Sequence, residues 1–224
     1  MSEIIYKSKN AVVINKPVGI SSQPDRSGAG DAMTSLSEQL SALGESGSLY
    51  PVHRLDNVVG GLIVYARSKK AASELSSLIK ELGIGKEYYA VIEGCLPDGE
   101  YSDYLVKDTL GNRARICGPT DRDAKLATLT FKALASVETK RGVRSLVKVI
   151  LHTGRFHQIR AQLSSRGAAI IGDSKYGSRD FMTRTPALFS CAIKANFLGE
   201  DINLHALPSL DKYPWNLFSA ENYI

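Results

Sequence analysis

The chain carries the run His53-Arg54-Leu55-Asp56, which is followed by Asn57-Val58-Val59-Gly60-Gly61 and then by the apolar stretch Leu62-Ile63-Val64-Tyr65-Ala66. The apolar stretch is typical of a buried strand. A strand interior rarely accepts Arg or Asp without a partner, because burying an unpaired charge is costly. A loop just before a strand accepts them and can direct them at a ligand. The run therefore indicates either a functional loop or a solvated loop that happens to be charged.

Further runs place polar residues beside apolar, strand-like stretches. They are Val12-Val13-Ile14-Asn15-Lys16-Pro17-Val18-Gly19-Ile20, Lys86-Glu87-Tyr88-Tyr89-Ala90-Val91-Ile92-Glu93-Gly94, Thr153-Gly154-Arg155-Phe156-His157-Gln158-Ile159-Arg160 and Ile170-Ile171-Gly172-Asp173-Ser174-Lys175-Tyr176-Gly177. Taken in this order with H-R-L-D, they resemble the catalytic domain of the RluA family of RNA pseudouridine synthases. The resemblance spans roughly residues 5 to 193, and the joint occurrence of H-R-L-D and T-G-R-x-H-Q-I-R carries most of it.

Length and composition suit one globular domain with a full core, since 43% of the 224 residues are hydrophobic and 23% are charged. The net charge of +5 is compatible with a polyanionic partner such as RNA but does not identify one. The three cysteines are far apart and odd in number, which favours reduced thiols in a cytoplasmic protein. The N-terminal residues lack the apolar core of a signal peptide, and no apolar run approaches the ~20 residues of a membrane span.

Periodicity and turn residues divide the chain into short elements. They predict strands at 11–15, 62–66, 88–92, 127–134 and 145–152, and helices at 31–43, 69–82 and 156–165. Ser68 is expected to cap the second helix and Gly83 to end it, while residues 139–142 form a turn between the last two strands. Many strands with few helices favour an α+β fold with a mixed, mostly antiparallel sheet.

The resemblance implies a bent sheet with flanking helices and a central catalytic cleft, the pseudouridine synthase fold. We expect residues 1–224 to form a single catalytic domain. Some relatives carry a separate small RNA-binding domain before the catalytic one. Here the first family-like strand starts near Ile4, so we expect the catalytic domain alone.

The family converts uridine to pseudouridine, which breaks a carbon–nitrogen glycosidic bond and joins carbon 5 of the base to the same sugar carbon. No redox change occurs, so the resemblance implies an isomerase with neither cofactor nor metal. Asp56 matches the essential aspartate of the family. That carboxylate either attacks the anomeric carbon or removes the neighbouring 2′ proton, and the sequence does not choose between the two routes.

Two other residues match catalytic positions of the family. Arg160 matches the arginine that pairs with the catalytic aspartate, and a desolvated carboxylate needs a cation to stay ionised. The alternative is that Arg160 lies on the exposed face of a helix. Tyr88 matches the tyrosine that packs on the target uracil, where stacking is worth ~1–3 kcal/mol per base. Taken singly, a strand tyrosine is more often part of the core.

Residues near these positions are candidates for RNA contact. Arg54 lies two residues from Asp56, on the same face of an extended segment, and matches the arginine that contacts RNA near the flipped nucleotide. His53 is expected to orient the loop by hydrogen bonding rather than act as an acid or base. Phosphate contact and a structural role in holding the cleft remain equally open for Lys16, Arg155 and His157. In the last of the quoted runs, Asp173 and Tyr176 look like fold determinants.

The chain departs from the family pattern at three positions. The family commonly has Thr and Ser where this chain has Val59 and Gly60, so two hydroxyls of the loop are absent. Gln162 stands where the family commonly has His, and its amide does not titrate near neutral pH. These changes concern substrate placement more than the three catalytic positions.

Two rival functions compete with this interpretation. A catalytically inactive RNA-binding protein of the same fold would have no need of a carboxylate in a phosphate-binding cleft, where it repels the ligand. A metal-dependent hydrolase could use Asp56 with His53, His152 and His157, but the last two are five apart rather than at i, i+4. Glycine-rich nucleotide-binding motifs are absent. We therefore expect a monomer whose partner is ribosomal or transfer RNA.

Overall fold

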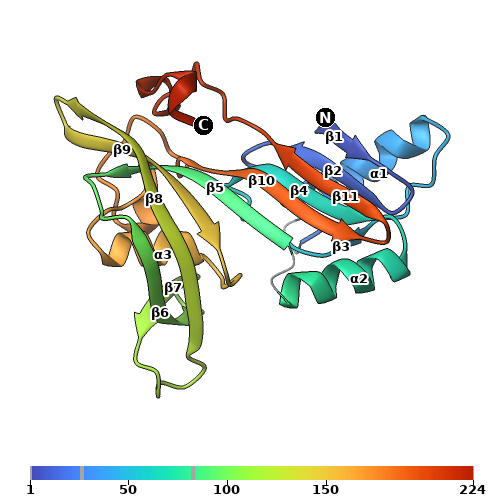
Figure 1. Ribbon diagram of the computed structural model, residues 1–224, viewed down its shortest axis with the longest axis horizontal. Helices are drawn as coiled ribbons and strands as arrows, with labels where there is room; N and C mark the ends of the chain where they lie inside the picture. Colours follow the sequence, from blue (N-terminus) through green and yellow to red (C-terminus); the bar gives the residue numbers. More distant parts are fainter. Residues whose placement is uncertain (1, 26–27, 82–83, 224) are drawn as a thin grey trace. The chain divides into compact units, whose positions relative to one another are not determined.

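The computed structural model describes residues 2–25, 28–81 and 84–223. The chain divides into two compact units, drawn in Figure 1. Unit 1 comprises Met1–Lys86 and Ser190–Ala206, and unit 2 comprises Glu87–Phe189 and Leu207–Ile224. Two strands, β5 (Ile84–Glu93) and β10 (Leu188–Phe197), contribute residues to both units.

Unit 1 is built on a sheet in which β4 (Gly60–Ala66) is apolar and buried along its whole length. Its order is β1-β2-β4-β10-β11, and β3 pairs with β4. The bounds are β1 Glu3–Lys7, β2 Ala11–Lys16, β3 Tyr50–Pro51, β4 Gly60–Ala66 and β11 Glu200–His205. β2 and β4 are antiparallel, with Ala11 opposite Ala66 and Lys16 opposite Gly61. This register places the end of β2 beside the start of β4, where the H-R-L-D loop enters the sheet.

Two capped helices belong to unit 1. Helix α1 (Ala32–Ala42) begins after Asp31, whose side chain accepts a hydrogen bond from the main-chain N–H of Thr34. Helix α2 (Lys69–Lys80) begins after Ser68, as predicted, and lies beside β3 and β4 in Figure 1. The residues expected to end that helix, Leu82 and Gly83, lie outside the described part of the chain.

Unit 2 contains a second run of antiparallel strands, β5-β9-β8-β6-β7. The bounds are β6 Gly99–Asp108, β7 Arg113–Cys117, β8 Lys125–Thr139 and β9 Gly142–Leu151. The turn predicted at residues 139–142 joins β8 to β9. The mixed, mostly antiparallel sheet with few helices therefore confirms the predicted fold class.

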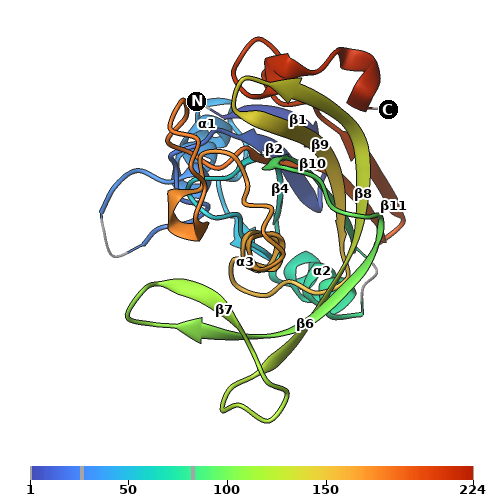
Figure 2. The same cartoon turned by 90° about the vertical axis from the view of Figure 1, so that its left-hand side faces the viewer.

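Helix α3 (Gln158–Ser165) packs on β6 and β7 in unit 2 (Figure 2). It starts two residues later than predicted, because His157 adopts the left-handed conformation with φ 50°. Apolar contacts hold the helix in place; they join Leu105, Ala114, Ala127, Ala161, Tyr176, Ile116 and Phe156. Short 3-10 helices lie at Ser174–Tyr176 (η1), Trp215–Leu217 (η2) and Ala220–Tyr223 (η3). Among the described residues, no helix has the length and apolar character needed to cross a membrane.

Candidate active site

The loop that carries Asp56 is fixed by main-chain hydrogen bonds to the segment that follows β2. The buried Ser22 hydroxyl donates to the carbonyl of Leu55 at 2.8 Å and accepts from the N–H of the same residue at 3.0 Å. On the other side of Asp56, the N–H of Gly19 donates to the carbonyl of Asn57 at 2.7 Å. The backbone is therefore held on both sides of Asp56 without using its carboxylate.

Lys16 lies at the base of this loop and is fully buried. Its ammonium donates to the carbonyls of Pro17 at 3.0 Å and Ile20 at 2.8 Å. Burial lowers the pKa of Lys16 to about 8, and the nearby negative charge of Asp56 opposes that decrease. These contacts favour the structural alternative for Lys16, and they place a cation within electrostatic range of Asp56.

His53 makes a contact that suits an orienting role. Its Nε2 accepts a hydrogen bond from the main-chain N–H of Val64 in β4, at 3.2 Å. Burial, together with the positive charge of Lys86, lowers the pKa of His53 to about 3. The ring is therefore neutral near pH 7, and its hydrogen bond to Val64 fixes the loop to β4. Leu55 is buried between the exposed Arg54 and the partly buried Asp56.

Arg160 occupies the first turn of α3 in unit 2 and is buried. It forms a bidentate ion pair with Asp173, which is also buried, with Nε–Oδ2 at 2.7 Å and Nη2–Oδ1 at 2.8 Å. Its guanidinium also lies 4.9 Å from the centre of the Tyr176 ring. The alternative of an arginine on an exposed helix face is therefore wrong. The predicted pairing of Arg160 with Asp56 stays a prediction.

His157 is held on both ring nitrogens. Nε2 lies 3.1 Å from Nη1 of Arg160, and Nδ1 lies 2.9 Å from the hydroxyl of Tyr176. Because an arginine nitrogen only donates, Nε2 is the acceptor and the ring proton is assigned to Nδ1. Tyr176 also accepts from the N–H of Ala114 at 2.7 Å, which ties the cluster to β7. These contacts favour a structural role for His157.

Polar side chains also fix the loop before α3 and the helix itself. Gln158 accepts hydrogen bonds from Thr153 Oγ1 at 2.8 Å and from the N–H of Arg155 at 3.0 Å, and so shapes the loop before α3. The exposed Arg155 donates through Nε to the carbonyl of Leu126 at 2.9 Å. Gln162, one of the departures from the family pattern, is fully buried and donates to Asp103 Oδ2 at 2.7 Å.

Tyr88 and Tyr89 lie on opposite faces of β5, and both are buried. The hydroxyl of Tyr89 donates to the main-chain carbonyl of Tyr223, and the two rings meet edge to face with centroids 5.1 Å apart. Tyr89 is therefore a core residue. Tyr88 lies opposite Val149 of β9, and its predicted role as the base-stacking ring stays a prediction.

The predicted site residues fall into two groups. His53, Arg54, Asp56 and Lys16 belong to unit 1, whereas Tyr88, Arg155, His157 and Arg160 belong to unit 2. Sequence reasoning missed Asp173 as the partner of Arg160. The available signal was a carboxylate directly after the apolar run at residues 168–172, since a buried charge needs a partner.

The histidines of the rival metal site each contact other residues. His53 accepts from Val64, His157 contacts Tyr176 and Arg160, and Nε2 of His152 lies 2.7 Å from Thr130 Oγ1. Within residues 2–25, 28–81 and 84–223, no group of three or more His, Cys, Asp or Glu is placed to hold a metal ion.

Comparison with known proteins identifies the family. The family model described as RNA pseudouridylate synthase matches residues 10–165. The ribosomal large subunit pseudouridine synthase C of Rickettsia bellii is 31% identical over 92% of this chain and 68% of its own length. The tRNA pseudouridine synthase C of Yersinia pestis is 32% identical over 79% of this chain and 71% of its own length.

Among solved structures, human RNA pseudouridylate synthase domain containing 4 shares the fold. Its TM-score is 0.75 at 24% identity, covering 93% of this chain and 89% of the human one. The matched model includes the H-R-L-D loop, β5 and the T-G-R-x-H-Q-I-R run. The chain therefore belongs to the RNA pseudouridylate synthase family, of the RluA type that its motifs resemble.

Proposed function

We propose that this protein isomerises uridine to pseudouridine in RNA, with Asp56 as the catalytic carboxylate. The observation that carries the proposal is the fixed backbone around Asp56, held by Ser22 on one side and by Gly19 on the other. A reacting carboxylate must be held in position before the substrate arrives, because misplacement by about 1 Å can cost ~10²-fold in rate.

The chemistry needs the carboxylate in its ionised form. Asp56 either forms a bond to the anomeric carbon or takes the 2′ proton, and in both routes the bond from that carbon to N1 of uracil breaks. The base then turns and carbon 5 bonds to the same sugar carbon, while the bond to Asp56 breaks or Asp56 returns the proton to the 2′ carbon, according to the route. The proton then leaves carbon 5 while N1 gains one. Lys16 supports this role from within unit 1, since its ammonium lies within electrostatic range of the Asp56 carboxylate.

Other residues have supporting roles in the proposal. Arg160 is the cation that faces the reacting carboxylate, held in its conformation by Asp173. Tyr88 supplies a ring on which the detached base stacks and turns. Arg54 contacts RNA beside the flipped nucleotide, for which its exposure is suitable.

The substrate in this proposal is a structured cellular RNA. Relatives are named for ribosomal large subunit RNA and for tRNA, so both classes are candidates. The net charge of +5 fits either polyanion. We infer that the protein acts as a cytoplasmic monomer.

The test is pseudouridine mapping of total RNA from a strain that lacks this gene, compared with its parent. Loss of signal at one or a few positions is expected, and purified protein should restore it on RNA from the deletion strain. Asp56→Asn protein should bind the same RNA without restoring the signal. Failure of the purified wild-type protein to form pseudouridine in that RNA would refute the proposal.

A further inference from the structure

The segment after η1 presents large apolar side chains to solvent in unit 2. Phe181 is 75% exposed and Met182 is 59% exposed. The arginines Arg179 and Arg184 flank them and are also exposed. Neighbouring exposed apolar side chains rimmed by charge often mark an interaction site.

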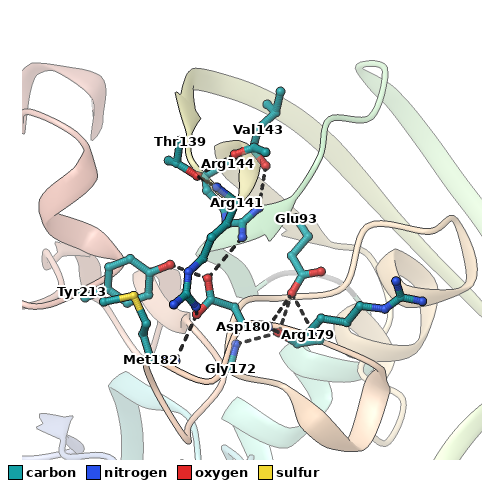
Figure 3. Close-up of polar contacts among 12 residues, drawn as sticks. Glu93, Thr139, Arg141, Val143, Arg144, Gly172, Arg179, Asp180, Met182 and Tyr213 are labelled. Carbon is teal, nitrogen blue, oxygen red and sulfur yellow. Dashed lines mark hydrogen bonds and ion pairs between the residues drawn. The ribbon is translucent and has the colours of Figure 1, made fainter.

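Glu93, the last residue of β5, fixes the backbone of this segment. One carboxylate oxygen of Glu93 accepts three hydrogen bonds, from Ser178 Oγ at 2.7 Å and from the N–H groups of Arg179 at 2.9 Å and Asp180 at 3.1 Å. Figure 3 shows these contacts, with the side chain of Arg179 extending away from Glu93. The segment is therefore a supported loop rather than a loose one.

A second carboxylate, which is buried, fixes the other side of the segment. Asp180 has a fully buried side chain that pairs with Arg144 at 3.2 Å and with Arg141 at 3.6 Å (Figure 3). It also accepts hydrogen bonds from the hydroxyl of Tyr213 and, at 3.1 Å, from the N–H of Met182. The only acidic residue of the segment is thus turned inward and neutralised, so the exposed surface keeps the positive charge of its arginines.

We propose that Phe181 and Met182 form a platform on which an unpaired RNA base outside the reaction centre stacks, while Arg179 and Arg184 contact the adjoining phosphates. The proposal rests on the proposed function, because it assigns a second contact to the same substrate. Aromatic rings accept any unpaired base, and guanidinium groups bind phosphate.

Geometry along β5 separates this platform from the base-stacking tyrosine. Tyr88 and Glu93 are five residues apart, which corresponds to about 17 Å in an extended strand. The platform therefore serves a nucleotide other than the target and contributes to the choice of substrate. A loop already fixed by Glu93 and Asp180 loses little conformational entropy when RNA binds.

The experiment measures binding of a fluorescein-labelled, mixed-sequence single-stranded RNA of 20 nucleotides and of the corresponding duplex. Phe181→Ala should weaken single-strand binding by about 5- to 100-fold, and Phe181→Trp should restore it. Duplex binding should change far less, because its bases are already stacked. Arg179→Ala should lower the salt slope of single-strand binding by about 0.7. Leu43→Ala is the matched control, since Leu43 is an apolar residue of unit 1 that is 62% exposed.

Several outcomes would overturn the platform. They are unchanged single-strand binding by Phe181→Ala, equal losses on single strand and duplex, and failure of the wild-type protein to bind the single strand. A change in oligomeric size for Phe181→Ala with unchanged RNA binding would assign the surface to self-association and overturn it too. Melting temperatures within a few degrees of wild type establish that each variant is folded.

Failure of the platform and failure of the proposed function are distinguishable. If wild-type protein forms pseudouridine and Phe181→Ala has the same KM and the same affinity, the platform alone is refuted. If wild-type protein forms no pseudouridine but its single-strand binding depends on Phe181, the proposed function fails and the platform is supported.

Discussion

The surroundings of Asp56 in unit 1 and of Arg160 in unit 2 are built in different ways. The Asp56 loop is held by neutral main-chain bonds to Ser22 and Gly19. Arg160 is held by its own side chain, through a buried ion pair with Asp173. A substitution that removes the Asp56 carboxylate should therefore leave the shape of the loop unchanged. Replacement of Arg160 by a neutral residue leaves the buried charge of Asp173 without its partner.

The largest expected effect comes from Asp56→Asn. Turnover should fall on the order of 10⁴-fold, because the amide neither attacks the sugar nor accepts its proton. The loop should keep its shape and the variant should stay folded, since the bonds of Ser22 and Gly19 do not involve this side chain. Pseudouridine formation in RNA measures turnover, and urea unfolding measures stability.

The exposed neighbour Asn57 supplies a control, because Asn57→Ala keeps the main-chain bond to Gly19. That variant should retain most of the activity. An active Asp56→Asn enzyme would remove Asp56 from the mechanism. A large loss of stability would show that the carboxylate itself holds the loop, contrary to the contrast with Arg160.

The next effect concerns stability in unit 2. Arg160→Met and Asp173→Asn should each lower the free energy of unfolding by about 3–5 kcal/mol, because each leaves one buried partner of the ion pair uncompensated. Arg160→Met should also reduce activity. Urea unfolding of the single variants and of the double variant completes a double-mutant cycle. The double variant should lose clearly less than the sum of the two single losses.

Additive losses in that cycle would show that Arg160 and Asp173 contribute independently. Asp103→Asn is a useful comparison, since Asp103 pairs with the partly exposed Arg166 at 2.8 Å. That loss should be smaller than about 1 kcal/mol, because solvent screens the pair.

Much of the fold follows from periodicity along the chain. The continuous apolar run of β4 and the alternation of β8 predict the strands that the structure contains. Sequence reasoning proposed no element for β6, which is largely exposed and therefore lacks an alternating apolar pattern. It also placed the start of α3 too early, because the left-handed φ of His157 accompanies contacts with Arg160 and Tyr176 that local sequence does not encode.

For the site, too, local sequence predicts some features and long-range packing decides the others. The positions of Asp56, Arg160 and Tyr88 in recognisable motifs made them candidates. The sequence around Asp173 indicates that this carboxylate needs a cation, but not that the cation is Arg160, because the two are thirteen residues apart and meet through the path of the chain after α3. The burial of Lys16 depends on the pairing of β2 with β4 and on the carbonyls of Pro17 and Ile20. Motifs thus indicate which residues matter, whereas long-range packing decides how each is held.

A third prediction tests the neutral imidazole beside Asp56. The pKa of His53 is about 3 in the folded protein against 6.5 for an ordinary histidine. As pH falls below 6.5, the unfolded chain takes up a proton that the folded protein does not, so stability decreases with falling pH. By pH 4 the loss from this group reaches up to about 3 kcal/mol.

The variant His53→Gln removes this titration while its amide oxygen can still accept from Val64. Urea unfolding of both proteins from pH 7 to pH 4 gives the difference in stability at each pH. Carboxylates titrate in both proteins and cancel in that difference. Wild type should lose its advantage over the variant as pH falls. A difference that stays constant with pH would mean that His53 is protonated as easily in the folded protein as in the unfolded chain.

The smallest effect tests whether main-chain bonds position Asp56. Ser22→Ala removes the hydroxyl that bonds both main-chain groups of Leu55 and should cost about 1–2 kcal/mol of stability. If that hydroxyl also positions the carboxylate, kcat should fall several-fold with KM unchanged, because Ser22 is buried and its hydroxyl bonds to Leu55. Ser41→Ala is the control, since Ser41 is exposed and its hydroxyl donates to the carbonyl of Ser37 within α1. A stability loss with unchanged kcat would mean that Gly19 and Lys16 suffice to place the loop. A fall in kcat beyond that of Asp103→Asn would instead assign to Ser22 the positioning role that Asp173 has for Arg160.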